Sequence, residues 1–233
     1  MKYMGSKNRI ARHILPIILK DRKPEQWYVE PFCGGCNSLD KVDNPRIGND
    51  SNRYLVALLK EMQMRVPFTP PHIGEKDYKE IRRNKDKYPD WLVGYVGFNL
   101  SFAAKFFGGY CRDKAGVRDY ENEAQQNLLV QQKLLVGVDF CCTDYRNLCI
   151  PDSSIIYCDP PYMGTTQYKD KFEHEVFYDW CRDMRRKGHI VFVSEYNMPR
   201  DFSCLWEKDV SSNLDVLSKG RRRTEKLFCL REA

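Results

Sequence analysis

The sequence predicts an α/β protein whose sheet is mostly parallel and is covered by helices on both faces. Two observations predict it: short apolar runs of strand length recur along the 233 residues, and segments with apolar residues at helical spacing separate them. The length accommodates one substantial core with one inserted subdomain and excludes a string of domains. Wholesale disorder is excluded because hydrophobic residues make up 42% of the chain and no low-complexity tract is present.

The first third of the chain predicts an amphipathic helix followed by two strand–helix units. We expect a helix over 7–20, a strand over 27–32, a strand over 46–49 and a helix over 52–64. Ser6 is suited to cap the first helix, and Pro16 threatens to kink or break it. The paired glycines in Cys33-Gly34-Gly35-Cys36 indicate a sharp turn after the first strand, with Ser38 as a possible start of a further helix.

The middle of the chain differs in character and indicates an insert. Three prolines interrupt residues 66–71, residues 75–90 are dense in both charge signs, and an aromatic, glycine-rich stretch follows over 91–110. A helix expected over 121–135 closes this region. We therefore predict one domain formed by residues 1–65 and 135–233, with residues 66–134 inserted as a mainly helical subdomain.

Strand patterns return in the last part of the chain. We expect strands over 136–142, 154–158 and 189–194, with a helix over 173–187. The segments around 206–210 and 226–230 predict an antiparallel hairpin at the edge of the sheet.

Composition limits the setting of the protein. The net charge of +6 is compatible with a polyanionic partner without requiring one. No apolar stretch approaches the roughly 18 residues of a spanning helix, and the basic start is unlike a signal peptide, so we expect no membrane partner and a cytoplasmic protein. The ten cysteines are then expected to be reduced. Cys33 and Cys36 form the one C-x-x-C, and no second pair completes a metal set at the usual spacing.

Candidate chemistry lies at predicted strand ends, because ligands of open α/β sheets bind beyond the carboxyl ends of the strands. The turn at Gly34 allows a ligand to approach the backbone, and Asp50 is suited to accept both hydroxyls of a ribose. Each has a structural alternative, since Gly-Gly pairs commonly form turns and an acid after a strand commonly caps a helix.

Asp159-Pro160-Pro161-Tyr162, directly after the apolar run 155–158, is more specific. The two prolines fix the backbone and remove two amide donors, which leaves a carboxylate and a carbonyl as acceptors beside an aromatic ring. The carboxylate of Asp159 and the carbonyl of Pro160 can accept the two hydrogens of an exocyclic amine while Tyr162 stacks on the ring that bears it.

With these motifs in order, nearly the whole chain resembles the Dam-type DNA adenine methyltransferases, in particular short phage-borne members with the cofactor motif first and the catalytic motif last. The resemblance extends to Ser194-Glu195-Tyr196-Asn197, which is similar to the segment that ends the strand after the catalytic one. It implies a Rossmann-like fold that binds S-adenosylmethionine. In that fold Lys7 would contact the cofactor carboxylate, Asp50 the ribose, and Asp144 the adenine amino group. The cofactor-binding residues that it implies are Tyr3, Lys7, Phe32, Gly34, Asp50, Asp144 and Tyr145.

The same resemblance implies that the insert recognises double-stranded DNA and that the family's recognition hairpin is shortened to about residues 110–120. It implies transfer of a methyl group to adenine N6 of a base flipped out of the duplex, with Asp159, Pro160 and Tyr162 as catalytic residues. The basic residues expected to contact DNA are Arg112, Lys219, Arg221 and Arg222. The resemblance predicts neither the target sequence, nor the oligomeric state, nor a restriction partner.

Two alternatives remain open. Cytosine N4 presents a similar exocyclic amine to the same pocket, and a methyltransferase-derived protein that binds DNA without catalysis would retain much of the sequence. A dinucleotide oxidoreductase is disfavoured because the glycine turn lacks the G-x-G-x-x-G spacing.

Overall fold

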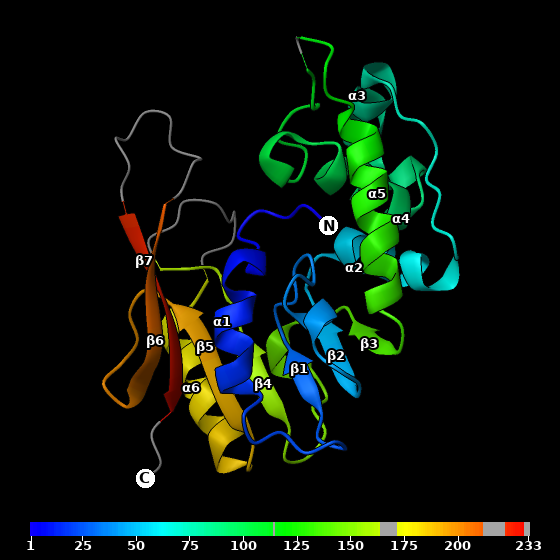
Figure 1. The fold of residues 1–233 in the computed structure, drawn as a ribbon. Coiled ribbons are helices and arrows are strands. Elements are labelled where there is room, and N and C mark those ends of the chain that lie inside the picture. The colour runs from blue at the N-terminus through cyan, green and yellow to red at the C-terminus, as the bar shows by residue number, and fades with distance from the viewer. Residues whose placement is uncertain (114, 164–171, 212–221, 231–233) are drawn as a thin grey trace.

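The computed structural model, which describes residues 1–113, 115–163, 172–211 and 222–230, contains a seven-stranded sheet of order β3-β2-β1-β4-β5-β7-β6 (Figure 1). The strands are β1 (Tyr28–Glu30), β2 (Arg46–Asn49), β3 (Val138–Cys141), β4 (Ile155–Cys158), β5 (Ile190–Glu195), β6 (Phe202–Ser211) and β7 (Arg222–Leu230). The first five are parallel, and β7 runs antiparallel between β5 and β6. The predicted α/β fold and the predicted edge hairpin are both confirmed.

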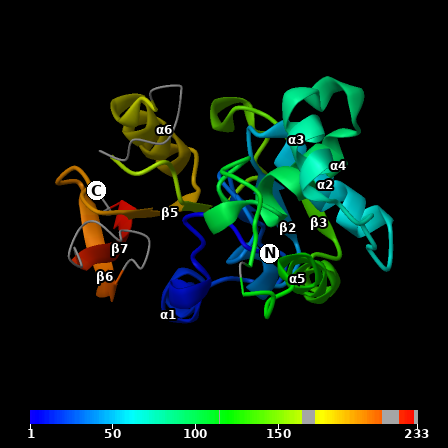
Figure 2. The same cartoon turned by 90° about the horizontal axis from the view of Figure 1, so that it is seen from above.

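Alternation along each strand divides the core between the two faces of the sheet. In β4, Ile155 and Tyr157 belong to one buried cluster, whereas Ile156 and Cys158 belong to the other. This follows from the period of two residues in a pleated strand. Figure 2 shows α1 (Asn8–Ile18) and α6 (His174–Arg186) on opposite sides of the sheet, so both faces are covered.

The helices begin and end close to the positions that the sequence predicts. The remaining α-helices are α2 (Arg53–Met64), α3 (Glu75–Arg83), α4 (Asp90–Gly94) and α5 (Tyr120–Leu134). Asn52 caps α2 by accepting from the amides of Tyr54 and Leu55. Pro16 lies inside α1 without ending it. The residue directly before that helix is Lys7, and the Ser6 hydroxyl accepts from the amide of Asn8 at 3.3 Å.

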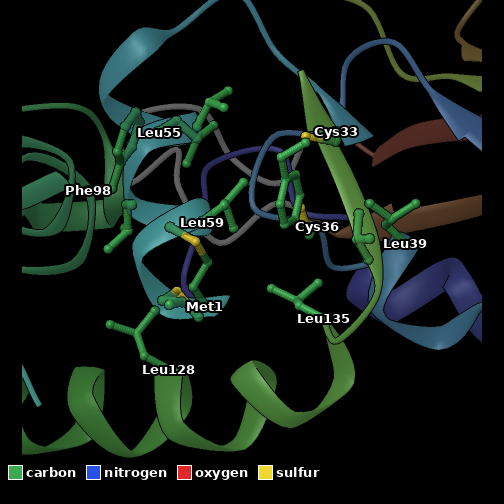
Figure 3. Close-up of a cluster of buried hydrophobic side chains, with 14 of the residues drawn as sticks. Met1, Cys33, Cys36, Leu39, Leu55, Leu59, Phe98, Leu128 and Leu135 are labelled. Atoms are coloured by element: carbon green, nitrogen blue, oxygen red, sulfur yellow. The ribbon is translucent and has the colours of Figure 1, made fainter. Parts of the chain in front are cut away.

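The helical region over 66–134 shares its core with the sheet domain. Figure 3 shows Leu128 of α5 and Phe98 of the π-helical turn Tyr95–Asn99 in one cluster with Leu59, Cys33 and Cys36. Because one cluster spans both regions, it marks no domain boundary. The boundaries at 66 and 134 therefore stay a prediction.

The prediction of a shortened recognition hairpin over 110–120 is wrong. Among the described residues of this range, none belongs to a strand, and Tyr110 makes one isolated bridge to Ser101. Instead the Asp113 carboxylate accepts from the backbone amides of Ala115, Val117 and Arg118 and closes a loop. A short acidic side chain that binds its own following amides competes with strand pairing.

Gly94 lets α4 approach α2 closely, and this approach yields a test of the fold. A Cβ atom at residue 94 would lie 2.1 Å from the Tyr54 carbonyl oxygen, which is backbone and cannot rotate away. We expect Gly94→Ala to lower the free energy of unfolding by about 1–3 kcal/mol or more, measured by urea denaturation. Lys60→Ala, at an exposed position of α2, is the control. Equal midpoints for Gly94→Ala and the wild type would contradict this packing.

Candidate active site

The candidate site lies at the carboxyl ends of the parallel strands, where β1 is flanked by β2 and β4. The strand order reverses here, and a polar residue ends or directly follows each of these three strands: Glu30, Asn49 and Asp159. Asn49, 1% exposed, joins the ends of β1, β2 and β3: its Nδ2 donates to the carbonyls of Pro31 and Thr143 at 3.0 Å, and its Oδ1 accepts from the Thr143 amide at 3.1 Å. The Asn49 side chain therefore fixes the ends of β1, β2 and β3 relative to one another.

Asp50 joins the glycine turn to the start of α2. Its Oδ2 accepts from the Gly34 amide at 3.2 Å and its Oδ1 from the Asn52 amide at 2.9 Å. Burial raises the pKa of the Asp50 carboxyl, although the two amides act in the opposite direction. The residue that caps α2 is Asn52, so Asp50 is not the cap of that helix.

The glycines of the turn make room for Tyr3. A Cβ atom at either Gly34 or Gly35 would lie 2.6 Å from an atom of the Tyr3 side chain, and Gly34 has a positive φ of 47°. The Tyr3 ring also lies 5.6 Å from the ring of Phe98. The structure thus places Tyr3, the first residue of the amino-terminal motif Tyr3-Met4-Gly5-Ser6-Lys7, against the glycine turn.

Lys7 joins the amino-terminal motif to the Asp159-Pro160-Pro161-Tyr162 segment. Its Nζ lies 3.3 Å from Asp159 Oδ1, 3.0 Å from Glu225 Oε2 and 2.5 Å from the Tyr162 hydroxyl. The Tyr162 hydroxyl in turn donates to Glu225 Oε2 at 2.8 Å. Because an ammonium has three N–H groups, these three contacts match its donors, and a further acceptor would have to replace one of them.

Glu195, at the end of β5, holds the chain that follows Asp159-Pro160-Pro161-Tyr162. Its carboxylate accepts from the amides of Met163 at 3.1 Å and Tyr196 at 2.7 Å. The rings of Tyr162 and Tyr196 meet edge to face, with centroids 4.6 Å apart. The Tyr162 ring is thus held by a neighbouring ring as well as by its hydroxyl.

Residues 3–90 match the sequence model of the D12 class N6 adenine-specific DNA methyltransferases. This confirms the predicted resemblance to adenine-specific DNA methyltransferases, while the Dam-type subdivision stays a prediction. The matched segment contains Tyr3, Lys7, Phe32, Gly34 and Asp50 and ends before the catalytic tetrapeptide.

Among the known proteins that resemble this chain are a methyltransferase sequence and a solved structure. The Type II methyltransferase M.FokI of Planomicrobium okeanokoites is 25% identical over 217 residues, which cover 78% of this chain and 31% of that protein. This chain therefore corresponds to about a third of the length of M.FokI. The solved structure of SMU.472, assigned as a methyltransferase and complexed with SAH, aligns with a TM-score of 0.43 at 12% identity and covers 100% of this chain and 54% of that one.

The carboxyl groups that end the strands have raised pKa values. Burial raises the pKa of Asp159 to about 6, although Lys7 opposes the shift. Burial also raises the pKa of Glu30 to about 8 and that of Glu195 to about 7. For Lys7, burial alone would lower the pKa, but Asp159 and Glu225 outweigh it and raise the value. Perturbed carboxyls gathered in one place are typical of functional sites.

The other predicted cofactor residues lie on the α6 side of the strand ends. The rings of Phe32 and Tyr145 lie 5.1 Å apart, and Tyr145 also packs against Trp180 at 5.2 Å. The Asp144 carboxylate accepts two bonds from the Arg146 guanidinium at 2.8 Å, and this contact lowers the pKa of Asp144. Asp144 is therefore already paired, which sequence reasoning did not anticipate.

The predicted DNA contacts are dispersed. Arg112, in the insert, pairs with Glu75 at 2.5 Å. Arg222 begins β7, while Lys219 and Arg221 lie outside the described residues. Within the described parts of the chain, no group of three His, Cys, Asp or Glu side chains could hold a metal ion. None of the helices described there combines the length and the apolar character of a membrane span.

Sequence reasoning missed three acids of the site. Glu195 lies inside the segment 194–197 that resembles the family, and Glu30 is the last residue of β1. An acid in an otherwise apolar strand is a usable signal for both. Glu225 offers no such signal, because it belongs to the alternating, charged edge hairpin.

Proposed function

We propose that the protein is a site-specific DNA methyltransferase that methylates N6 of an adenine flipped out of double-stranded DNA, with S-adenosylmethionine as methyl donor. The observation that carries the proposal is the joining of Asp159 and Tyr162 to Lys7. Through it, the amine-binding tetrapeptide meets the segment that matches the N6 adenine-specific family.

The residues present fit S-adenosylmethionine, whose sulfonium supplies an electrophilic methyl group. Asp50, held by two amides, keeps lone pairs for the ribose hydroxyls. Phe32 and Tyr145 form an aromatic wall for the adenine ring. Lys7 would reach the cofactor carboxylate only by giving up one of its three contacts.

The catalytic residues would act by orientation. The Asp159 carboxylate and the Pro160 carbonyl accept the hydrogens of the target amine, which directs the nitrogen lone pair at the methyl group. Tyr162 stacks on the extruded base and offsets part of the cost of unstacking it, which is about a few kcal/mol. Asp159 acts as an acceptor and therefore in its ionised form.

Asp159 supplies a test with a defined pH dependence. Its pKa of about 6 means that the carboxyl becomes protonated as the pH falls through that value, so we expect methyl transfer to decline below about pH 6. Asp159→Asn should lower the single-turnover rate by about 10²-fold or more while cofactor affinity is largely kept. Transfer of labelled methyl groups, followed across the pH range, measures the decline at low pH and the rate of the variant. Wild-type rates in Asp159→Asn would contradict the assignment.

The methylated product tests the proposed substrate. Nuclease digestion of treated DNA followed by mass spectrometry should give N6-methyladenine. N4-methylcytosine would favour the cytosine alternative, and DNA binding without any methyl incorporation would favour a catalytically silent binder.

We also assign phosphate binding to two cations beside the site. Arg12 Nε of α1 and Lys208 Nζ of β6 both lie near Nε2 of His13, at 3.3 and 3.2 Å, and His13 stacks on Trp206. No described carboxylate lies within ion-pair distance of either cation. Because Lys208 pairs in register with Glu225, this flank adjoins the catalytic network. Converging cations without a counter-charge attract phosphate.

Removing these cations should weaken DNA binding and make it less dependent on salt. For Arg12→Ala with Lys208→Ala, we expect the slope of log affinity against log salt to become shallower by about 0.9 for each phosphate that the variant no longer neutralises. Fluorescence anisotropy with a DNA duplex measures the slope, and cofactor affinity should not change. Lys187→Ala, exposed at the end of α6 on the other face, is the control. An unchanged slope in the double variant would refute the assignment.

A further inference from the structure

Glu225 of β7 is a partly buried carboxylate in the candidate site that no sequence motif marks. Its side chain is 14% exposed, and its Oε2 lies 3.0 Å from Lys7 Nζ and accepts from the Tyr162 hydroxyl at 2.8 Å. The residue lies 63 positions from Tyr162 along the chain and 218 from Lys7. Only the fold brings these three together.

The backbone that carries Glu225 belongs to a paired strand, β7. Glu225 lies opposite Lys208 of β6, and the pairing of β7 with β5 begins at the next residue, Lys226. A side chain on such a strand can hold a partner in place, since sites built on strands are more precise than sites on loops. Tyr162, by contrast, lies in the irregular segment after β4.

The Tyr162 hydroxyl is held from two directions. It accepts from Lys7 Nζ and donates to Glu225, so its one hydrogen and one of its lone pairs are both used. Two bonds at the far end of the ring restrict its rotation, and the Tyr196 ring restricts it from the side. The orientation of the Tyr162 ring is therefore set through its hydroxyl.

Glu225 is also one of two carboxylates that pair with Lys7. The Nζ atom of Lys7, whose side chain is 8% exposed, lies 3.3 Å from Asp159 and 3.0 Å from Glu225. Without Glu225, Asp159 would be its one carboxylate partner in this network, and the ammonium would compete more strongly with the target amine for that acceptor. Glu225 thus shares the ammonium with Asp159.

We propose that Glu225 is a positioning residue: it fixes the Tyr162 ring for stacking on the extruded base and holds Lys7 so that Asp159 stays available to the target amine. This inference rests on the proposed function and deepens it.

Glu225 should also influence the titration of Asp159. Burial is the main cause of the raised pKa of Asp159, Lys7 opposes the shift, and the negative charge of Glu225 adds to it. The charged or titratable groups that face Asp159 from the surrounding elements are Lys7 before α1, Glu30 of β1, Tyr157 of β4, Tyr162 after β4, Glu195 of β5 and Glu225 of β7.

Glu225→Gln tests the inference because it removes the charge and keeps the shape. We expect the single-turnover rate to fall about tenfold, as for the loss of one charge-assisted hydrogen bond. The acid limb of the pH–rate profile should move to lower pH, because Asp159 loses a negative neighbour. A residue that only supports the fold would leave that limb in place. Cofactor affinity should stay within about twofold of the wild type, which also reports that the variant is folded.

Tyr162→Phe reaches the same contact from the other end, since it keeps the ring and loses the hydroxyl. With a 2-aminopurine base at the target position, both single variants should show weaker stacking of the extruded base. In the stacking measurement, the double variant should be no worse than Tyr162→Phe alone. Both changes act on the same contact, the one between the Tyr162 hydroxyl and the Glu225 carboxylate. Additive losses would overturn the proposed route through the hydroxyl.

Glu207→Gln is the matched control. Glu207 lies on the adjacent strand β6, its side chain is 63% exposed, and among the described residues it forms one ion pair, with Lys226 at 3.9 Å. This substitution should leave the rate and the pH profile unchanged. If wild-type protein methylates DNA and Glu225→Gln matches it in rate and pH profile, the inference is wrong while the function stands. If wild-type protein transfers no methyl group, the function fails and the inference with it.

Discussion

The burial of one ammonium group, that of Lys7, is the constraint on which the rest of the site depends. A lysine that is 8% exposed loses most of its hydration, and such a loss is tolerated only when carboxylates replace the water. Asp159 and Glu225 provide them, from the end of β4 and from β7. Since Lys7 directly precedes α1, this pairing fixes the amino-terminal segment, the Asp159-Pro160-Pro161-Tyr162 segment and the edge hairpin relative to one another. Removing either carboxylate takes away one of the two ion pairs of the buried ammonium.

Around that ammonium, carboxyl groups are in excess. Glu30 and Glu195 end parallel strands and Asp159 directly follows another, and burial, with a smaller contribution from neighbouring acids, raises their pKa values. A cation that enters such a site favours the ionised forms. The proposed methyl donor carries a sulfonium charge, so the acids that destabilise one another in the protein alone would stabilise that ligand, and less so the neutral thioether that remains after transfer.

The sequence predicted strands and turns, because these depend on residues that are close together in the chain. Strand β4 begins within one residue of its expected start because polar residues and a turn flank a short apolar run, and the position of Asp159-Pro160-Pro161-Tyr162 follows from that strand. The pairing of Lys7 with Asp159, the contact of Asp144 with Arg146 and the role of Glu225 were not predicted, since each depends on which side chains the fold places together. The hairpin expected over 110–120 failed for a local reason, the amide-binding carboxylate of Asp113, which weighed more than a family pattern.

The helical region over 66–134 and the glycine turn are connected through side-chain contacts. Gln131 of α5, itself buried, donates from Nε2 to the Gly35 carbonyl and to the Asp40 carboxylate at 2.9 Å, and Leu128 of the same helix packs into the cluster that contains Cys33 and Cys36. A force on α5 would therefore act on the turn that carries Gly34. If the region over 66–134 binds DNA, as the resemblance implies, the free energy of that binding is coupled through close-packed side chains to the position of the glycine turn. By linkage, a ligand that orders the turn would favour the same arrangement of α5, so that cofactor and DNA would each strengthen the binding of the other.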